Sequence, residues 1–363
     1  MTVDRSRQRR LPHIAIVAAA GLAAAILLAA VPFARAQAPP QVAPHFGFND
    51  DWHLHQNLLD LAAKAGSDTV RTGMYWAGVE YKRDEYYWDL YDQLYARMLS
   101  LGIRPIFLLT NAPCWAAVSE KACKRGRKSD LSQPPARSEY GEWKEFAGLV
   151  AHRYPEALAI EIWNEPNLTR FWYPRPKPRR YAEVLRTAAE GIHAANSAMP
   201  VLLAGMVLTR HKNENKLGFK RFLRRVYKSG GGQVADGIAF HPFPAFWRRS
   251  IPRVLGKLEA LMASLRAIMS RFGDVDTEVW VTEMGLSTTG RPNGFTEAEQ
   301  AEGLSAMYRL LSKMPGVTAV IVHRFLDQQG GKRNWQTGLG VVSGSGNPKP
   351  AYCALAAERG VPC

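Results

Sequence analysis

Hydrophobic residues recur at two different spacings along the chain. Short apolar runs bounded by turn residues predict buried strands, and segments between them repeat apolar residues every three to four positions, as amphipathic helices do. We expect strands at His45–Asn49, Thr69–Met74, Pro105–Thr110, Ala159–Trp163, Val201–Gly205, Gly237–His241, Glu278–Thr282 and Ala319–Arg324. We expect helices at Tyr91–Leu101, Trp143–His152, Tyr181–Ala195, Lys220–Tyr227, Val254–Phe272 and Glu297–Leu311.

Eight strands separated by mostly helical connections predict one α/β domain, a closed parallel (β/α)8 barrel (TIM barrel). The alternative is an open doubly wound sheet. Such a sheet normally has a glycine-rich phosphate-binding turn after its first strand, whereas here Gly47-Phe48-Asn49 leads to Asp50-Asp51-Trp52. The pattern therefore favours the barrel.

Two of the predicted strands end in a glutamate. Ala157–Asn167 reads ALAIEIWNEPN and reaches Glu165, and Thr277–Gly285 reads TEVWVTEMG and reaches Glu283. Pro166 cannot extend a strand ladder and is expected to hold Glu165 in an extended conformation. Since the carboxyl ends of barrel strands share one rim, the two acids are expected to face each other across a cleft, although each alone could be a surface acid.

Other polar groups are predicted at the same rim. Arg71 lies on the second strand, Asn111 follows the third, Asn164 precedes Glu165, and His241 ends the sixth. An arginine beside one of two carboxylates lowers the pKa of that carboxylate, and the resulting anion raises the pKa of its partner. Arg71, Asn164 and His241 could each instead be structural groups with satisfied hydrogen bonds.

The amino terminus resembles an export signal. Arginines precede an apolar run of 18 residues, from Ile14 to Val31, and alanines recur from Ala34 to Ala38. This predicts a signal peptide over residues 1–38, a barrel over residues 39–363, and a location outside the cell, in the periplasm or in the cell envelope. Because a membrane span needs ~20 residues, an uncleaved membrane anchor is the alternative.

The net charge is +15, and residues 1–38 contribute +4 of it. Such a surplus can attract nucleic acid, anionic lipid or acidic polysaccharide, or keep a protein soluble. Export and the lack of a nucleic-acid-binding motif argue against nucleic acid. The segment Arg170–Arg180 combines aromatic residues with five cations and could flank a cleft near Glu165; it could equally be a proline-stiffened surface loop.

The four cysteines are Cys114, Cys123, Cys353 and Cys363. An even number in an exported chain suggests disulfides, and of three possible connectivities the local one, Cys114–Cys123 with Cys353–Cys363, closes two short loops. The spacing fits no zinc pattern, so we expect no metal ion and no cofactor.

The residues around both glutamates resemble the large clan of retaining (β/α)8 glycoside hydrolases that includes families 5 and 39. Trp163–Asn167 is similar to the acid/base strand of this clan, and Val281–Gly285 to its nucleophile strand. Further similar stretches are Val70-Arg71 with Trp76 and Glu80, Trp88-Asp89, Pro113–Ala116, Phe171-Trp172 with Tyr181-Ala182, Asp236–Pro242, Gly338-Leu339 and Pro348–Tyr352.

The resemblance implies specific roles. Glu165 would be the general acid/base and Glu283 the nucleophile of a double displacement that cleaves β-glycosidic bonds in a polysaccharide or oligosaccharide. We expect the enzyme to be endo-acting and monomeric. Asn164 would contact the sugar 2-hydroxyl, Arg71 would orient Glu283, and His241 would line the sugar site. The alternatives are a carbohydrate-binding barrel without turnover and a lyase or transglycosylase of exopolysaccharide synthesis or export.

The sequence departs from the clan at the eighth strand. Many members have a tryptophan there as a sugar platform, whereas this chain reads Val322–Asp327, VHRFLD. Phe325 or Trp335 could substitute. His323 and Arg324 would make this floor cationic, which together with Arg170–Arg180 motivates the hypothesis of an anionic substrate.

Aromatic rings in the loops after the strands are candidates for stacking on sugar faces. These are Trp76, Trp115, Trp172 and Trp335, each of which could instead pack in the interior. Trp143 and Trp280 are expected in the core.

Overall fold

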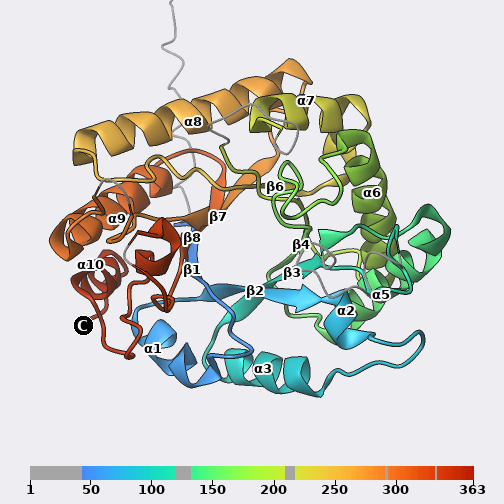
Figure 1. Ribbon diagram of the computed structural model, residues 1–363, viewed down its shortest axis with the longest axis horizontal. Helices are drawn as coiled ribbons and strands as arrows, with labels where there is room; N and C mark the ends of the chain where they lie inside the picture. Colours follow the sequence, from blue (N-terminus) through green and yellow to red (C-terminus); the bar gives the residue numbers. More distant parts are fainter. Residues whose placement is uncertain (1–42, 120–131, 209–216, 291–292, 332) are drawn as a thin grey trace, which may run out of the picture. The chain divides into compact units, whose positions relative to one another are not determined.

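Eight parallel strands close into a barrel in which each strand pairs with the next along the chain and β8 pairs with β1 (Figure 1). The computed structural model describes residues 43–119, 132–208, 217–290, 293–331 and 333–363. These belong to the unit that spans Gln41–Cys363. The strands are β1 (His45–Asn49), β2 (Thr69–Tyr75), β3 (Arg104–Thr110), β4 (Ala159–Ile162), β5 (Val201–Leu203), β6 (Gly237–Phe240), β7 (Glu278–Met284) and β8 (Val317–His323).

A ring of helices surrounds the strands, as Figure 1 shows. The helices between strands are α1 (Leu59–Lys64), α2 (Trp76–Val79), α3 (Asp89–Ser100), α5 (Tyr140–Arg153), α6 (Pro178–Ala195), α7 (Phe219–Lys228), α8 (Ile251–Arg271) and α9 (Glu297–Ser312), and α10 (Pro350–Glu358) follows β8. The predicted barrel is therefore confirmed, with element ends that differ from the expected ones by a few residues.

Both faces of the strands are buried, as is usual for parallel strands. The barrel interior holds Ile106, Leu202, Ala239, Trp280, Ala319 and Ile321 with two neighbours, while the larger apolar layer lies between strands and helices. Trp143 and Trp280 are buried, as expected. This packing leaves the carboxyl ends of the strands, and the loops that follow them, to carry the chemistry.

One predicted disulfide is present. Cys353 and Cys363 are bonded, with their Cα atoms 5.0 Å apart. Cys114 is also disulfide-bonded, but its predicted partner Cys123 lies outside the described residues. The predicted signal peptide lies outside them as well. Among the described helices, none combines the length and apolar character needed to cross a bilayer.

Candidate active site

A buried arginine occupies the centre of the barrel mouth. Arg71 on β2 is only 2% exposed, and its Nε and Nη2 donate hydrogen bonds to both carboxylate oxygens of Glu161 on β4, at 2.7 and 3.1 Å. Glu161 is fully buried and also accepts a hydrogen bond from the Gly205 backbone N–H at 2.9 Å. A buried cation needs such a partner, because removing an unpaired charge from water is very costly.

The Nη1 and Nη2 groups of Arg71 also donate to two candidate site residues. Nη1 donates to Glu283 Oε1 at 2.8 Å, and Nη2 donates to Asn164 Oδ1 at 2.9 Å. The predicted contact between Arg71 and Glu283 is thus present. Because Arg71 engages the amide oxygen of Asn164, the amide nitrogen is the group oriented to donate to a substrate.

Glu165 lies in the loop after β4 and not in an extended conformation. Its φ is 38° and that of Trp163 is 75°, so the expectation of extended angles before Pro166 is wrong. Positive φ is rare for such residues and persists only where surrounding contacts over-determine the backbone. Here the Glu165 N–H donates to the Gly205 carbonyl at 3.1 Å, and the Asn167 side chain donates to the Val207 and Leu217 carbonyls.

Gly205 therefore connects three parts of the site. Its N–H bonds Glu161, its carbonyl bonds Glu165, and a Cβ at this position would lie 2.0 Å from Nε2 of His241. Only glycine allows the imidazole to approach so closely.

His241 lies between the two predicted catalytic glutamates. Its Nδ1 is 2.9 Å from Glu165 Oε1 and 3.8 Å from Glu283 Oε2, and its Nε2 is 3.2 Å from the Thr282 hydroxyl. One carboxylate oxygen of Glu165 and one of Glu283 lie within 4.8 Å of each other. The two side chains are 11% and 10% exposed, so neither is sealed from solvent.

The two carboxyl groups differ in acidity. Burial raises the pKa of Glu165, and the neighbouring Glu283 anion adds to this, against the opposing effect of His241. Burial would also raise the pKa of Glu283, but the positive charges of His241, His323 and Arg71 lower it to about 2. The pKa of His241 is raised: burial opposes this, but the charges of Glu283 and Glu165 prevail. One glutamate is thus favoured as an acid and the other as an anion.

The donor atoms of Glu165, His241 and Glu283 are close enough together to hold a metal ion. The Arg71 guanidinium bonded to Glu283 puts a permanent positive charge beside this position, which disfavours a second cation. The donor set fits an acid/base pair with its orienting histidine better than a metal centre.

Comparison with known proteins identifies the family. A family model described as cellulase (glycosyl hydrolase family 5) matches residues 37–314. The chain belongs to this family. Membership implies glycosidase activity on a carbohydrate substrate. No match was found among curated proteins.

Solved structures of glycoside hydrolases share the fold. A family 39 glycoside hydrolase from Bacteroides cellulosilyticus WH2 is 21% identical with a TM-score of 0.65, and the match covers 87% of this chain and 64% of that one. GH5_18 from Streptomyces cattleya in complex with GlcNAc is 16% identical, with a TM-score of 0.63 and coverage of 87% and 79%. The family 39 enzyme from Xanthomonas axonopodis pv. citri is 16% identical, with a TM-score of 0.61 and coverage of 89% and 68%.

The prediction that Trp76 and Trp172 stack on sugars is wrong for this family 5 member. Trp76 is fully buried against Trp115, Trp143 and Phe146, and Trp172 is fully buried with its ring edge-on to Trp163 and Tyr181. Neither ring presents a face to a substrate, because each fills a gap between the barrel and its helices.

The other predicted contacts remain at the surface of the mouth. Trp115 is partly buried, and the Arg83 guanidinium covers its ring at 4.2 Å. Trp335 is partly exposed and packs with Phe243 and Phe246, next to His323. Asn111 follows β3 with a φ of 59°, and no contact to either glutamate is recorded for it among the described residues. Of the four predicted tryptophans, Trp115 and Trp335 are thus the two that are not fully buried.

The prediction of a cationic floor at β8 is wrong. Arg324 is 6% exposed and forms a buried ion pair with Asp50, and burial lowers the pKa of His323. Phe325 is fully buried against Phe48 and cannot serve as a platform. An anionic substrate therefore finds no free positive charge on this floor.

Glu161 and Gly205 are the important site residues that were not predicted. The signal for Glu161 was a single acid in the otherwise apolar run Ile160-Glu161-Ile162, which requires a buried partner such as Arg71. Gly205 gave no signal, because its role depends on a contact with a side chain of another strand.

Substitution of Glu161 tests the role of the buried pair. Glu161→Gln keeps the shape but leaves Arg71 without its bidentate anion, so we expect the free energy of unfolding to fall by about 3 kcal/mol. We expect kcat to fall by about tenfold to a hundredfold, because Glu283 loses its fixed position. Chemical denaturation and steady-state kinetics measure both. Glu259→Gln, on an exposed position of α8, is the control and should change neither.

Substitution of Gly205 tests the approach of His241. In Gly205→Ala the new methyl group displaces the imidazole from Glu165, and we expect kcat/KM to fall by about tenfold or more. Gly141→Ala in α5 meets no atom within 4 Å and should retain full activity with equal or slightly higher stability. Full activity of Gly205→Ala would contradict the proposed position of His241.

Proposed function

We propose that this glycoside hydrolase cleaves β-glycosidic bonds in a polysaccharide or oligosaccharide with net retention, in an endo mode and as an exported monomer. The observation that carries the proposal is the pair of carboxylates with oxygens within 4.8 Å of each other and with opposite pKa shifts. Retaining enzymes use carboxyl groups about 5–5.5 Å apart, and inverting enzymes leave about 6.5–9.5 Å for a water molecule.

The reaction follows from the two protonation states. Protonated Glu165 donates to the leaving glycosidic oxygen while the Glu283 anion, held by Arg71, attacks the anomeric carbon. The covalent glycosyl-enzyme is then hydrolysed by a water molecule that Glu165, now ionised, deprotonates. Asn164 is available to donate to the sugar 2-hydroxyl, and Trp335 offers an aromatic face beside the mouth.

His241 is placed to stabilise the negative charge that forms on Glu165 during the reaction. It bonds Glu165 and lies near Glu283, so it disfavours the neutral form of both acids. When Glu165 loses its proton, the imidazole already beside it stabilises the new anion. This makes His241 a positioning residue whose effect appears in the pH profile.

Substitution of each glutamate tests the assignment. We expect Glu283→Gln to lower kcat by about 10³-fold or more, because no nucleophile remains. We expect Glu165→Gln to lower it by about 10²–10⁴-fold, through loss of acid and base catalysis. With an aryl β-glycoside, azide should restore turnover of Glu165→Ala and give a β-glycosyl azide, since azide needs no base. Retained hydrolysis in Glu283→Gln would rule out the mechanism.

The pH profile provides an independent test. Glu283, with a pKa of about 2, is ionised throughout the usual range, so kcat/KM should fall only as pH rises through the raised pKa of Glu165. In His241→Asn the hydrogen bond that lowers the pKa of Glu165 is lost, and the alkaline limb should move to higher pH. A limb that stays in place or moves to lower pH would contradict the role of His241.

A further inference from the structure

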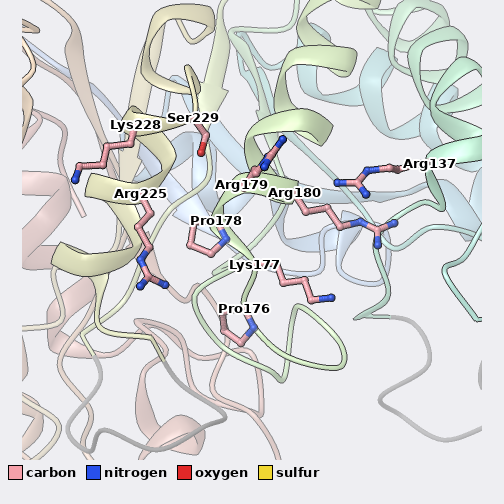
Figure 2. Close-up of a pocket in the computed structure, with 9 residues that line it drawn as sticks. All are labelled: Arg137, Pro176, Lys177, Pro178, Arg179, Arg180, Arg225, Lys228 and Ser229. Carbon is pink, nitrogen blue, oxygen red and sulfur yellow. The ribbon is translucent and has the colours of Figure 1, made fainter.

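A cationic pocket lies on the outer side of the barrel, between the start of α6 and the end of α7. It has a volume of about 510 Å³ and is lined by Arg137, Pro176, Lys177, Pro178, Arg179, Arg180, Arg225, Lys228 and Ser229 (Figure 2). The lining contains six cationic side chains and no acid. A site of this volume can hold several sugar units or a small ligand.

Most of this charge is not neutralised. Glu183 pairs with Arg137 at 2.8 Å and reaches Arg179 at 3.8 Å, so one acid serves two of the cations. Within the described part of the chain, no ion pair is recorded for Lys177, Arg225 or Lys228. The Nε of Arg180 is buried without a hydrogen-bond partner there, although its Nη2 donates to the Pro135 carbonyl.

The pocket is built from separate elements that converge. In Figure 2 Arg225 and Lys228 on α7 lie to one side of Pro176, Lys177 and Pro178, and Arg137 lies to the other. Pro176 and Pro178 fix the backbone that presents Lys177, which reduces the entropy lost on binding. Several cations gathered around one hollow favour a ligand with several anionic groups over a single ion.

The pocket is also continuous in sequence with the candidate active site. The loop after β4 carries Glu165 and then runs through Pro176 and Lys177 into α6. By contrast, the floor at β8 offers no free positive charge, since Arg324 is paired with Asp50. Among the described residues, the outer pocket therefore gathers the cationic side chains that the floor at β8 lacks.

We infer that this pocket binds carboxylate groups of an acidic polysaccharide, as a site separate from the glutamate pair. The inference rests on the proposed function for the kind of polymer. The pocket would hold a stretch of the polysaccharide that bears uronic acids. A glycosidic bond in a neutral stretch of the same polysaccharide would then lie between Glu165 and Glu283 and be cleaved.

Binding to polygalacturonate, compared with a neutral β-glucan of similar length, tests the inference. The test variant is Lys177→Gln with Arg225→Gln and Lys228→Gln. The control is Arg253→Gln with Lys257→Gln and Arg271→Gln, which removes the same charge from exposed positions of α8. We expect the test variant to bind polygalacturonate about tenfold more weakly or worse, and the control to bind within about twofold of the unaltered protein.

Turnover of a neutral aryl β-glycoside separates this inference from the proposed function. The pocket variant should retain it, whereas Glu283→Gln should lose it and still bind polygalacturonate. If the pocket and control variants bound polygalacturonate equally weakly, the net charge of the protein would explain the binding, and the inference would be overturned. It would also be overturned if inorganic phosphate saturated the pocket without polygalacturonate binding, or if the pocket variant lost binding only to phosphatidylglycerol vesicles.

Discussion

The site depends on one buried cation. Arg71 bonds Glu161, Asn164 and Glu283, which come from two different strands and the loop after one of them, and it has almost no contact with water. The free-energy cost of burying the Arg71 charge is offset only while these three partners stay in place. The buried charge therefore holds the partners in position. Glu161 accepts from two of the donors, and Arg71 donates to one oxygen of Glu283, whose second oxygen lies 3.8 Å from His241 and 3.7 Å from His323.

This arrangement gives two similar acids opposite properties. Burial acts on both, but the positive charge is concentrated beside Glu283, whereas Glu165 faces His241 and the Glu283 anion. The strained backbone around Glu165 is held by the Gly205 carbonyl and by Asn167. The loop thus brings the acid to the anion at a distance that strand geometry alone would not give.

The fold and the principal pair could be predicted from the sequence because both are local patterns. Apolar runs give strands, and Glu165 follows one of them closely while Glu283 lies at the next-to-last position of another. What could not be predicted depends on contacts between distant residues. Trp76 and Trp172 follow strands as sugar platforms do, yet they meet partners such as Phe146 and Tyr181 in the interior. The charge of Arg324 was visible, but its burial against Asp50 was not.

The same distinction applies to substrate recognition. The cationic segment after Glu165 contributes to a pocket on the flank of the barrel, whereas Arg324, which follows β8, is held in an ion pair with Asp50. The stereochemistry of the product tests the central claim most directly. Proton NMR during cleavage of an aryl β-glycoside that the enzyme hydrolyses should show the β-anomer first, followed by slow mutarotation. Appearance of the α-anomer first would contradict a mechanism in which Glu283 attacks the sugar.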